Sequence, residues 1–228
     1  MPELGLTDNN TIKKYHLIRS KRKTLSLQIN NNAQLVVRAP QRLSIKEVNA
    51  FIDEKADWIN KKSRSIKSNL IPKPNYSEGE HFLYLGNQYP LTHNTEQKIT
   101  LNFDGVAFRL NGDGYSAFHA WYKLAFKKIA VPRLEYYAEL YQLSYQQVRL
   151  KAQKTLWGSC SSVNNINLNY LLIRAPISVV DYVIVHELAH TKHKNHSKSF
   201  WQLVETILPE YKASKTWLKN NGHKLHNL

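Results

Sequence analysis

The sequence predicts an α+β protein, with short strands in its first half and amphipathic helices in its second. Strand-like runs separated by glycine recur up to residue 114, and helical periodicity takes over from Tyr115. With 228 residues, 42% of them hydrophobic, the chain can bury a core and corresponds to one or two domains. We therefore expect a β-rich N-terminal lobe with one amphipathic helix over residues 1–114, and a helical core with a small sheet over residues 115–228.

The first predicted elements are a hairpin and a helix. Residues 25–29 alternate between apolar and polar side chains, and residues 35–37 follow a turn-like stretch, which predicts two paired strands. Ser44 and Glu47 form a capping box just before apolar residues at helical spacing. This pattern predicts a helix over residues 45–66.

Short strands and one long helix follow. Residues 82–85, 98–103 and 106–110 are apolar runs bounded by glycines, and each predicts a strand. Residues 117–140 have helical periodicity, with Pro132 expected to interrupt or kink the helix.

The last third of the chain predicts two strands and two helices. Residues 147–152 and 166–172 are typical of strands, joined by a loop that contains residues 157–160. Ser178, with an acidic residue three positions later, is expected to cap a helix, and a further helix is expected over residues 197–208.

Composition indicates the partners and the compartment. Lys and Arg outnumber Asp and Glu by 32 to 17, a net charge of +15, which attracts polyanions such as nucleic acid or nucleotides. The basic residues between Lys13 and Lys23 form either an anion-binding patch or one face of an exposed hairpin. A single cysteine, Cys160, leaves no internal disulfide, and no apolar run is long enough to span a membrane. We expect a cytoplasmic protein without membrane contact.

The chemistry is concentrated in the run His186-Glu187-Leu188-Ala189-His190. On a helix, residues four apart lie on the same face, so His186 and His190 can bind one ion together. Neutral imidazoles suit Zn²⁺, and Glu187 can take a proton from a zinc-bound water.

A catalytic zinc site needs a third protein ligand, and two histidines could supply it. His196 lies six residues after His190, a spacing found in known zinc peptidases, and Ser197 after it is typical of the next helix cap. His193, three residues after His190, competes if the first helix continues. The break expected before Ser197 favours His196.

These residues resemble the YgjP-like metallopeptidase family, which is allied to the SprT-like and WLM zincins. The resemblance extends over about residues 12–208 and rests on further matching segments: residues 19–24, 58–59, 154–162, 165–169, 175–176, 195–197 and 200–201. It implies a zincin-like fold in which His186, His190 and His196 bind zinc and Glu187 is the catalytic acid and base.

The implied function is that of a zinc metallopeptidase, a hydrolase acting on a peptide or an unfolded protein through a Glu-activated zinc-bound water. One alternative is a nucleoside-triphosphate pyrophosphatase that cleaves UTP at the same metal site, which the net charge favours but the lack of a glycine-rich phosphate loop does not. Another is a DNA-associated SprT-like protease held on nucleic acid by the basic surface. A metal-binding module without activity is the remaining alternative.

Other residues are expected near the substrate. Trp157 is expected to wall the cleft or to pack against the active helix, and Asn167 and Asn169 lie on one face of a strand that could pair with an extended peptide. An oxyanion stabiliser is also needed, and the candidates, which the sequence does not rank, are Tyr170, Arg174 and Tyr182.

Overall fold

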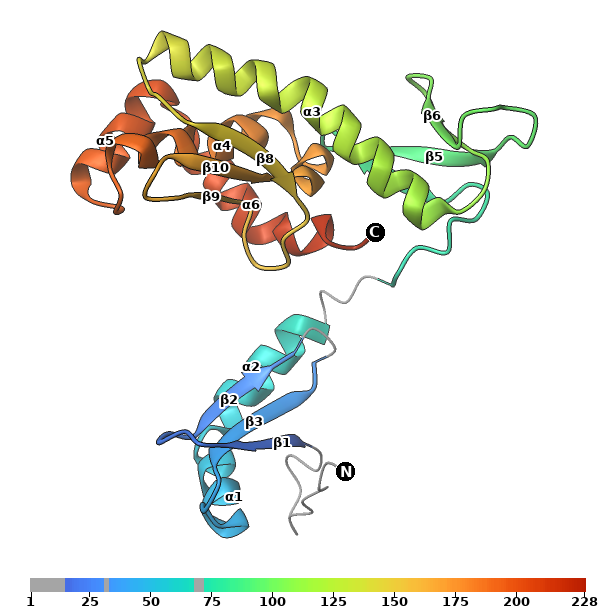
Figure 1. Cartoon of the computed structure of the whole chain (residues 1–228). Helices are drawn as coiled ribbons and strands as arrows, with labels where there is room; N and C mark the ends of the chain where they lie inside the picture. The colour runs from blue at the N-terminus through green and yellow to red at the C-terminus, as the bar shows by residue number, and fades with distance from the viewer. Residues whose placement is uncertain (1–14, 31–32, 68–71) are drawn as a thin grey trace. The chain divides into compact units, whose positions relative to one another are not determined.

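The computed structural model describes residues 15–30, 33–67 and 72–228 of the chain (Figure 1). The predicted α+β class is confirmed, because helices and three small sheets make up the described residues. The contacts divide the chain into two compact units, Met1–Ile71 and Pro72–Leu228. Within the described residues, no helix combines the length and the apolar character needed to cross a bilayer.

The division between the units lies earlier than the boundary expected between residues 114 and 115. The strands of residues 81–110 share a core with the helix that follows them, which explains the difference. The centroid of the Phe118 ring lies 4.1 Å from that of Phe82 and 5.0 Å from that of Phe108. These strands therefore belong to the C-terminal unit.

The N-terminal unit is a three-stranded sheet followed by two helices. In chain order its elements are β1 (Tyr15–Ser20), β2 (Ser26–Ile29), β3 (Leu35–Pro40), α1 (Ile45–Glu54) and α2 (Ala56–Lys67).

The antiparallel pairing of β2 with β3 confirms the predicted hairpin, whereas β1, parallel to β3, was not predicted. The capping box is confirmed, since the Ser44 hydroxyl accepts from the Glu47 amide and the Glu47 carboxylate accepts from the Ser44 amide. The single predicted helix is divided at Lys55. Of the basic cluster, Lys13 and Lys14 lie outside the described residues.

The C-terminal unit begins with a four-stranded sheet and a long helix. Its strand order is β4-β5-β7-β6, and the elements are β4 (His81–Tyr84), β5 (Asn87–His93), β6 (Leu101–Phe103), β7 (Phe108–Leu110) and α3 (Gly114–Leu140). Strand β5 was not predicted. Helix α3 is capped by Asp113 and includes Pro132, so the proline does not end it.

A second sheet, a 3-10 helix and three α-helices complete this unit. The elements are β8 (Gln147–Lys151), β9 (Gly158–Cys160), β10 (Asn165–Asn169), a 3-10 helix η1 (Tyr170–Arg174), α4 (Ile177–Lys192), α5 (Lys198–Ile207) and α6 (Tyr211–Leu225). The strand order is β8-β10-β9. The strand predicted over residues 166–172 is too long, because the Asn169 side chain accepts from the Leu171 amide and starts the 3-10 helix. Strand β9 lies where only a loop was expected.

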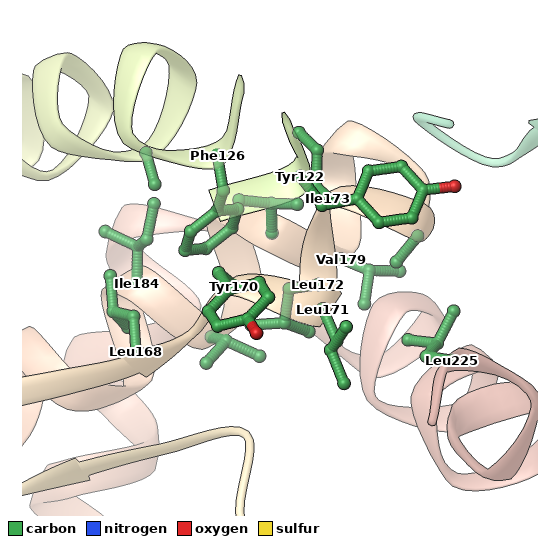
Figure 2. Close-up of a cluster of buried hydrophobic side chains, with 14 of the residues drawn as sticks. Tyr122, Phe126, Leu168, Tyr170, Leu171, Leu172, Ile173, Val179, Ile184 and Leu225 are labelled. Atoms are coloured by element: carbon green, nitrogen blue, oxygen red, sulfur yellow. The ribbon is translucent and has the colours of Figure 1, made fainter. Parts of the chain in front are cut away.

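Helix α4 lies at the centre of this unit and packs against α3, α5, α6, β9 and β10. Figure 2 shows part of the core around it, in which Val179 and Ile184 of α4 lie among side chains of α3, β10, η1 and α6. The prediction that Ser178 caps this helix is wrong. Pro176 occupies the cap position, and the Ser178 carbonyl accepts a hydrogen bond from the Ser214 hydroxyl.

Candidate metal centre

The last turns of α4 carry the His-Glu-x-x-His residues. The residues that precede them, Val179 to Val185, are all buried. Apart from Asp181 they are hydrophobic, and they fix the helix in the core. His186 and His190 follow one turn apart, with ring centroids 4.9 Å apart. Tertiary burial of the helix therefore determines where both imidazoles lie.

The chain reverses direction after α4 and brings a third imidazole to this pair. His193, at the end of the helix, has an extended backbone, and Ser197 caps α5 by accepting from the Phe200 amide. His196 lies in the turn between them. Ring nitrogens of His186, His190 and His196 lie within 4.8 Å of one another, and His193 is not part of this cluster.

The aromatic ring of Phe200 forms the floor beneath the three histidines. This side chain is fully buried in the first turn of α5. Its centroid lies 5.0 Å from that of His186, 4.5 Å from that of His190 and 4.8 Å from that of His196. The apolar floor restrains the imidazoles without competing for their nitrogens.

The three histidines fit a zinc ion. Zinc–nitrogen distances of about 2.0–2.1 Å in a tetrahedral site place two ligand atoms roughly 3.3 Å apart. The Nε2 atoms of His186 and His196 are 3.0 Å apart. His190 donates from Nδ1 to the His193 carbonyl at 3.0 Å, which leaves its Nε2 lone pair free for a metal.

The charge state of the imidazoles also suits a cation. The pKa of His186 is lowered to about 3, first by burial and then by the neighbouring His190, His196 and Lys215. Burial is also the main cause that lowers the pKa of His190. Both rings are therefore neutral at physiological pH, the form in which histidine binds metals.

Glu187 is a buried carboxyl group without a partner. It is only 5% exposed, and no side chain or amide among the described residues donates a hydrogen bond to it. Burial raises its pKa to about 8. The backbone of Gly158 in β9 lies directly against it, since a Cβ at that position would be 2.5 Å from Glu187 Oε1. A buried acid with a perturbed pKa beside a histidine cluster is typical of an active site.

The comparison with known protein families agrees with this geometry. The model of the YgjP-like metallopeptidase domain matches residues 23–221 of the chain. The chain belongs to the YgjP-like metallopeptidase family. Membership identifies it as a hydrolase of the metallopeptidase type and implies a catalytic metal.

Two solved structures resemble part of this YgjP-like chain, both metallopeptidase zymogens. Abylysin of Pyrococcus abyssi is 24% identical, with a TM-score of 0.37, over 43% of this chain and 98% of its own. Jannalysin of Methanocaldococcus jannaschii is 19% identical, with a TM-score of 0.36, over 41% of this chain and 94% of its own. Among curated proteins, none matches the chain significantly.

The residues expected to line the substrate cleft of this YgjP-like protein have separate roles. Asn169 is fully buried and donates to the carbonyls of Gln153 and Leu156, so it shapes the loop before β9. Asn167 donates to the Ser159 hydroxyl across the β9–β10 pair. The expectation that their strand pairs with a peptide is wrong, because β10 is the central strand of its sheet and β9 is at the edge.

Trp157 packs against α6, and this contact was not predicted. Its ring stacks on His226 at 4.4 Å, and Gly222 gives it room. His226, at the C-cap of α6, is therefore partly buried against this ring.

Of the three oxyanion candidates, Tyr182 lies beside the histidines. Its ring centroid is 5.9 Å from that of His186. Tyr170 instead bonds His119, and Arg174 donates to the Leu225 carbonyl near the C-terminal end of α6.

Proposed function

We propose that this YgjP-like protein is a zinc-dependent peptidase in which His186, His190 and His196 bind the metal and Glu187 is the catalytic acid and base. The observation that carries the proposal is the unpaired, buried Glu187 carboxyl group next to three converging imidazoles. A purely structural metal site has no use for such a group, because a buried carboxyl without a hydrogen-bond partner is destabilising.

The residues of the chain define the proton transfers. Bound zinc supplies Lewis acidity, polarising the scissile carbonyl and increasing the acidity of a water. Glu187 takes the proton from the attacking water and passes it to the leaving amine. Burial raises its pKa to about 8 in the metal-free chain, and the positive charge of a bound zinc would lower this pKa towards the operating pH, where a group can both accept and donate a proton.

Strand β9 supports a peptide as the substrate. It is an edge strand, and its first residue, Gly158, lies against Glu187. An extended peptide can add to such an edge through main-chain hydrogen bonds, which would hold its backbone beside the catalytic group. We therefore assign the substrate-pairing role to β9 in place of β10.

The test combines zinc analysis with turnover of two substrates, an unfolded protein and UTP, by wild type and Glu187→Gln. We expect one zinc per chain in both proteins and proteolysis that falls about a thousandfold in the variant, within the range for loss of a general acid–base. Equal proteolysis by the two proteins would refute the role of Glu187. Glu187-dependent release of UMP without proteolysis would make the enzyme a nucleotide hydrolase.

The ligand set is tested with a matched pair of histidine variants. His196→Ala should lose zinc, whereas His193→Ala should retain it, because only the main-chain carbonyl of His193 bonds the cluster. Equilibrium dialysis against a chelator measures both. Zinc loss from His193→Ala alone would reverse the assignment.

A further inference from the structure

Lys215 is a cation held beside the metal centre by an aromatic ring. It is an exposed residue of α6, and its Nζ lies 3.9 Å from the centroid of the Trp201 ring. An ammonium group over an indole face is attracted by the ring quadrupole, and tryptophan is the best partner for this interaction. The ring therefore positions a charge that would otherwise move freely on a flexible side chain.

Trp201 connects this charge to the histidines. Its ring stacks on His196 with centroids 5.6 Å apart and an interplanar angle of 22°. It also stacks on Tyr211, which lies one turn before Lys215 on α6, at 5.5 Å. The two ring distances place the ammonium within about 10 Å of the centre of the His196 imidazole, at the margin of the metal centre.

Lys215 has no acidic partner among the residues that the structure describes. Its neighbour Lys212 forms an ion pair with Glu205 at 2.9 Å. Lys194, in the turn between the histidines, donates to the Ser161 carbonyl and to the Asn164 side chain. Lys212 is thus paired with an acid and Lys194 is held by neutral oxygens, whereas Lys215 has neither kind of partner among the described residues and lies over the indole ring.

The exposed side of the centre therefore carries a cation without an acidic partner among the described residues. His196 is its exposed histidine, and Glu187, the acid next to it, is buried. A positive charge without a partner beside a reaction centre attracts anionic groups and binds carboxylates through charge-assisted hydrogen bonds.

We propose that Lys215 is a specificity-determining residue whose ammonium group binds a carboxylate of the peptide substrate. The proposal rests on the peptidase function above. An extended peptide advances about 3.3 Å per residue, so the carboxylate belongs to an Asp or Glu within about three residues of the scissile bond. The enzyme accordingly prefers acidic peptides over their neutral counterparts.

The experiment compares pairs of fluorogenic peptides that differ only by Glu or Gln, placed in turn at each of the three positions on either side of the cleaved bond. Wild type should favour the Glu peptide at one or more positions by about fivefold in kcat/KM, the upper range for an exposed ion pair. Lys215→Met should remove this preference and leave the Gln peptide unaffected. Lys215→Glu should reverse it towards a Lys peptide.

Lys212→Met is the matched control, because Lys212 is on the same helix and already has an acidic partner. It should keep the wild-type preference. A preference that survives in Lys215→Met, or an equal loss on both peptides, would overturn the proposal, as would equal cleavage of every pair by wild type. In that last case the peptidase function itself would stand.

A binding measurement decides the matter if no peptide is cleaved, a result that would count against the peptidase function. Glu187→Gln is loaded with zinc, and the affinity of fluorescent Glu and Gln peptides is measured by anisotropy. The Glu peptide should bind about fivefold more tightly, and Lys215→Met in this background should abolish the difference. Equal affinities, or no binding of either peptide, would refute the role of Lys215.

Discussion

The two ends of helix α4 each bury one carboxyl group, and they treat it in opposite ways. Asp181 near the start is 7% exposed, and Glu187 near the end is 5% exposed. The Arg133 side chain of α3 donates two hydrogen bonds to the Asp181 carboxylate, at 2.5 and 2.9 Å. Glu187 has no such partner within the described residues, and burial raises its pKa to about 8.

This difference separates a structural acid from a reactive one on a single helix. A paired carboxylate ties α4 to α3. An unpaired carboxyl group weakens the fold whenever it is charged, and such a cost persists in proteins mainly where function needs it. Burial alone therefore does not distinguish the two groups, whereas the presence of a cation partner does.

The largest expected effect concerns the pH dependence of stability in the metal-free protein. The folded-state pKa of Glu187, about 8, lies above its ordinary value of 4.5, so folding favours the protonated form. Its contribution is complete below pH 4.5 and is lost as pH rises through 8. Relative to Glu187→Gln, chelated wild type should lose on the order of 4 kcal/mol between pH 5 and 8.5.

Urea unfolding of both chelated proteins at the two pH values measures this effect. The histidines titrate in both proteins, so the difference between the proteins reports Glu187. A constant difference across this range would show that Glu187 is not protonated at neutral pH in the absence of metal.

The second effect tests the structural end of the helix. Asp181→Asn should lower the free energy of unfolding by about 2 kcal/mol, less than for a fully buried pair, because the Arg133 side chain is 39% exposed. Zinc content and activity per folded molecule should not change. A double-mutant cycle with Arg133→Met isolates the pair, and loss of zinc without loss of stability would contradict the distinction between the two ends.

Local chemistry made several features predictable from the sequence. The capping box of Ser44 and Glu47 and the cap at Ser197 depend on neighbouring residues, and the structure has both. His186 and His190 share a helix face through spacing alone. The break expected before Ser197 is also a local feature, and it favoured His196 over His193. In the structure the ring nitrogens of His196 lie in the cluster with those of His186 and His190.

Tertiary contacts decided the features that were missed. Ser178 with an acid three residues later has the pattern of a helix cap, but Asp181 pairs with Arg133, which is 48 residues away in the chain. Strand β9 has only three residues, too few for any periodicity to show. Gly158 matters because of the distant Glu187, and no local pattern indicates that contact.

The smallest predicted effect tests how closely β9 positions the reactive acid. A Cβ at residue 158 would lie 2.5 Å from Glu187 Oε1, whereas one at residue 222 would lie 3.2 Å from Trp157 Nε1. Gly158→Ala should therefore shift the carboxyl group and lower kcat/KM about tenfold with zinc still bound, because a misplacement of about 1 Å can reduce a rate about a hundredfold.

Gly222→Ala is the control for this substitution. It should leave kcat/KM within about twofold, because the neighbouring tryptophan is a side chain that can move by a few tenths of an ångström, and alanine favours the helix by about 1 kcal/mol. Steady-state kinetics and zinc analysis of both variants make the comparison. If Gly158→Ala were as active as Gly222→Ala, the carboxyl group would tolerate displacement, and its unpaired burial would have to be explained without the positioning that β9 provides.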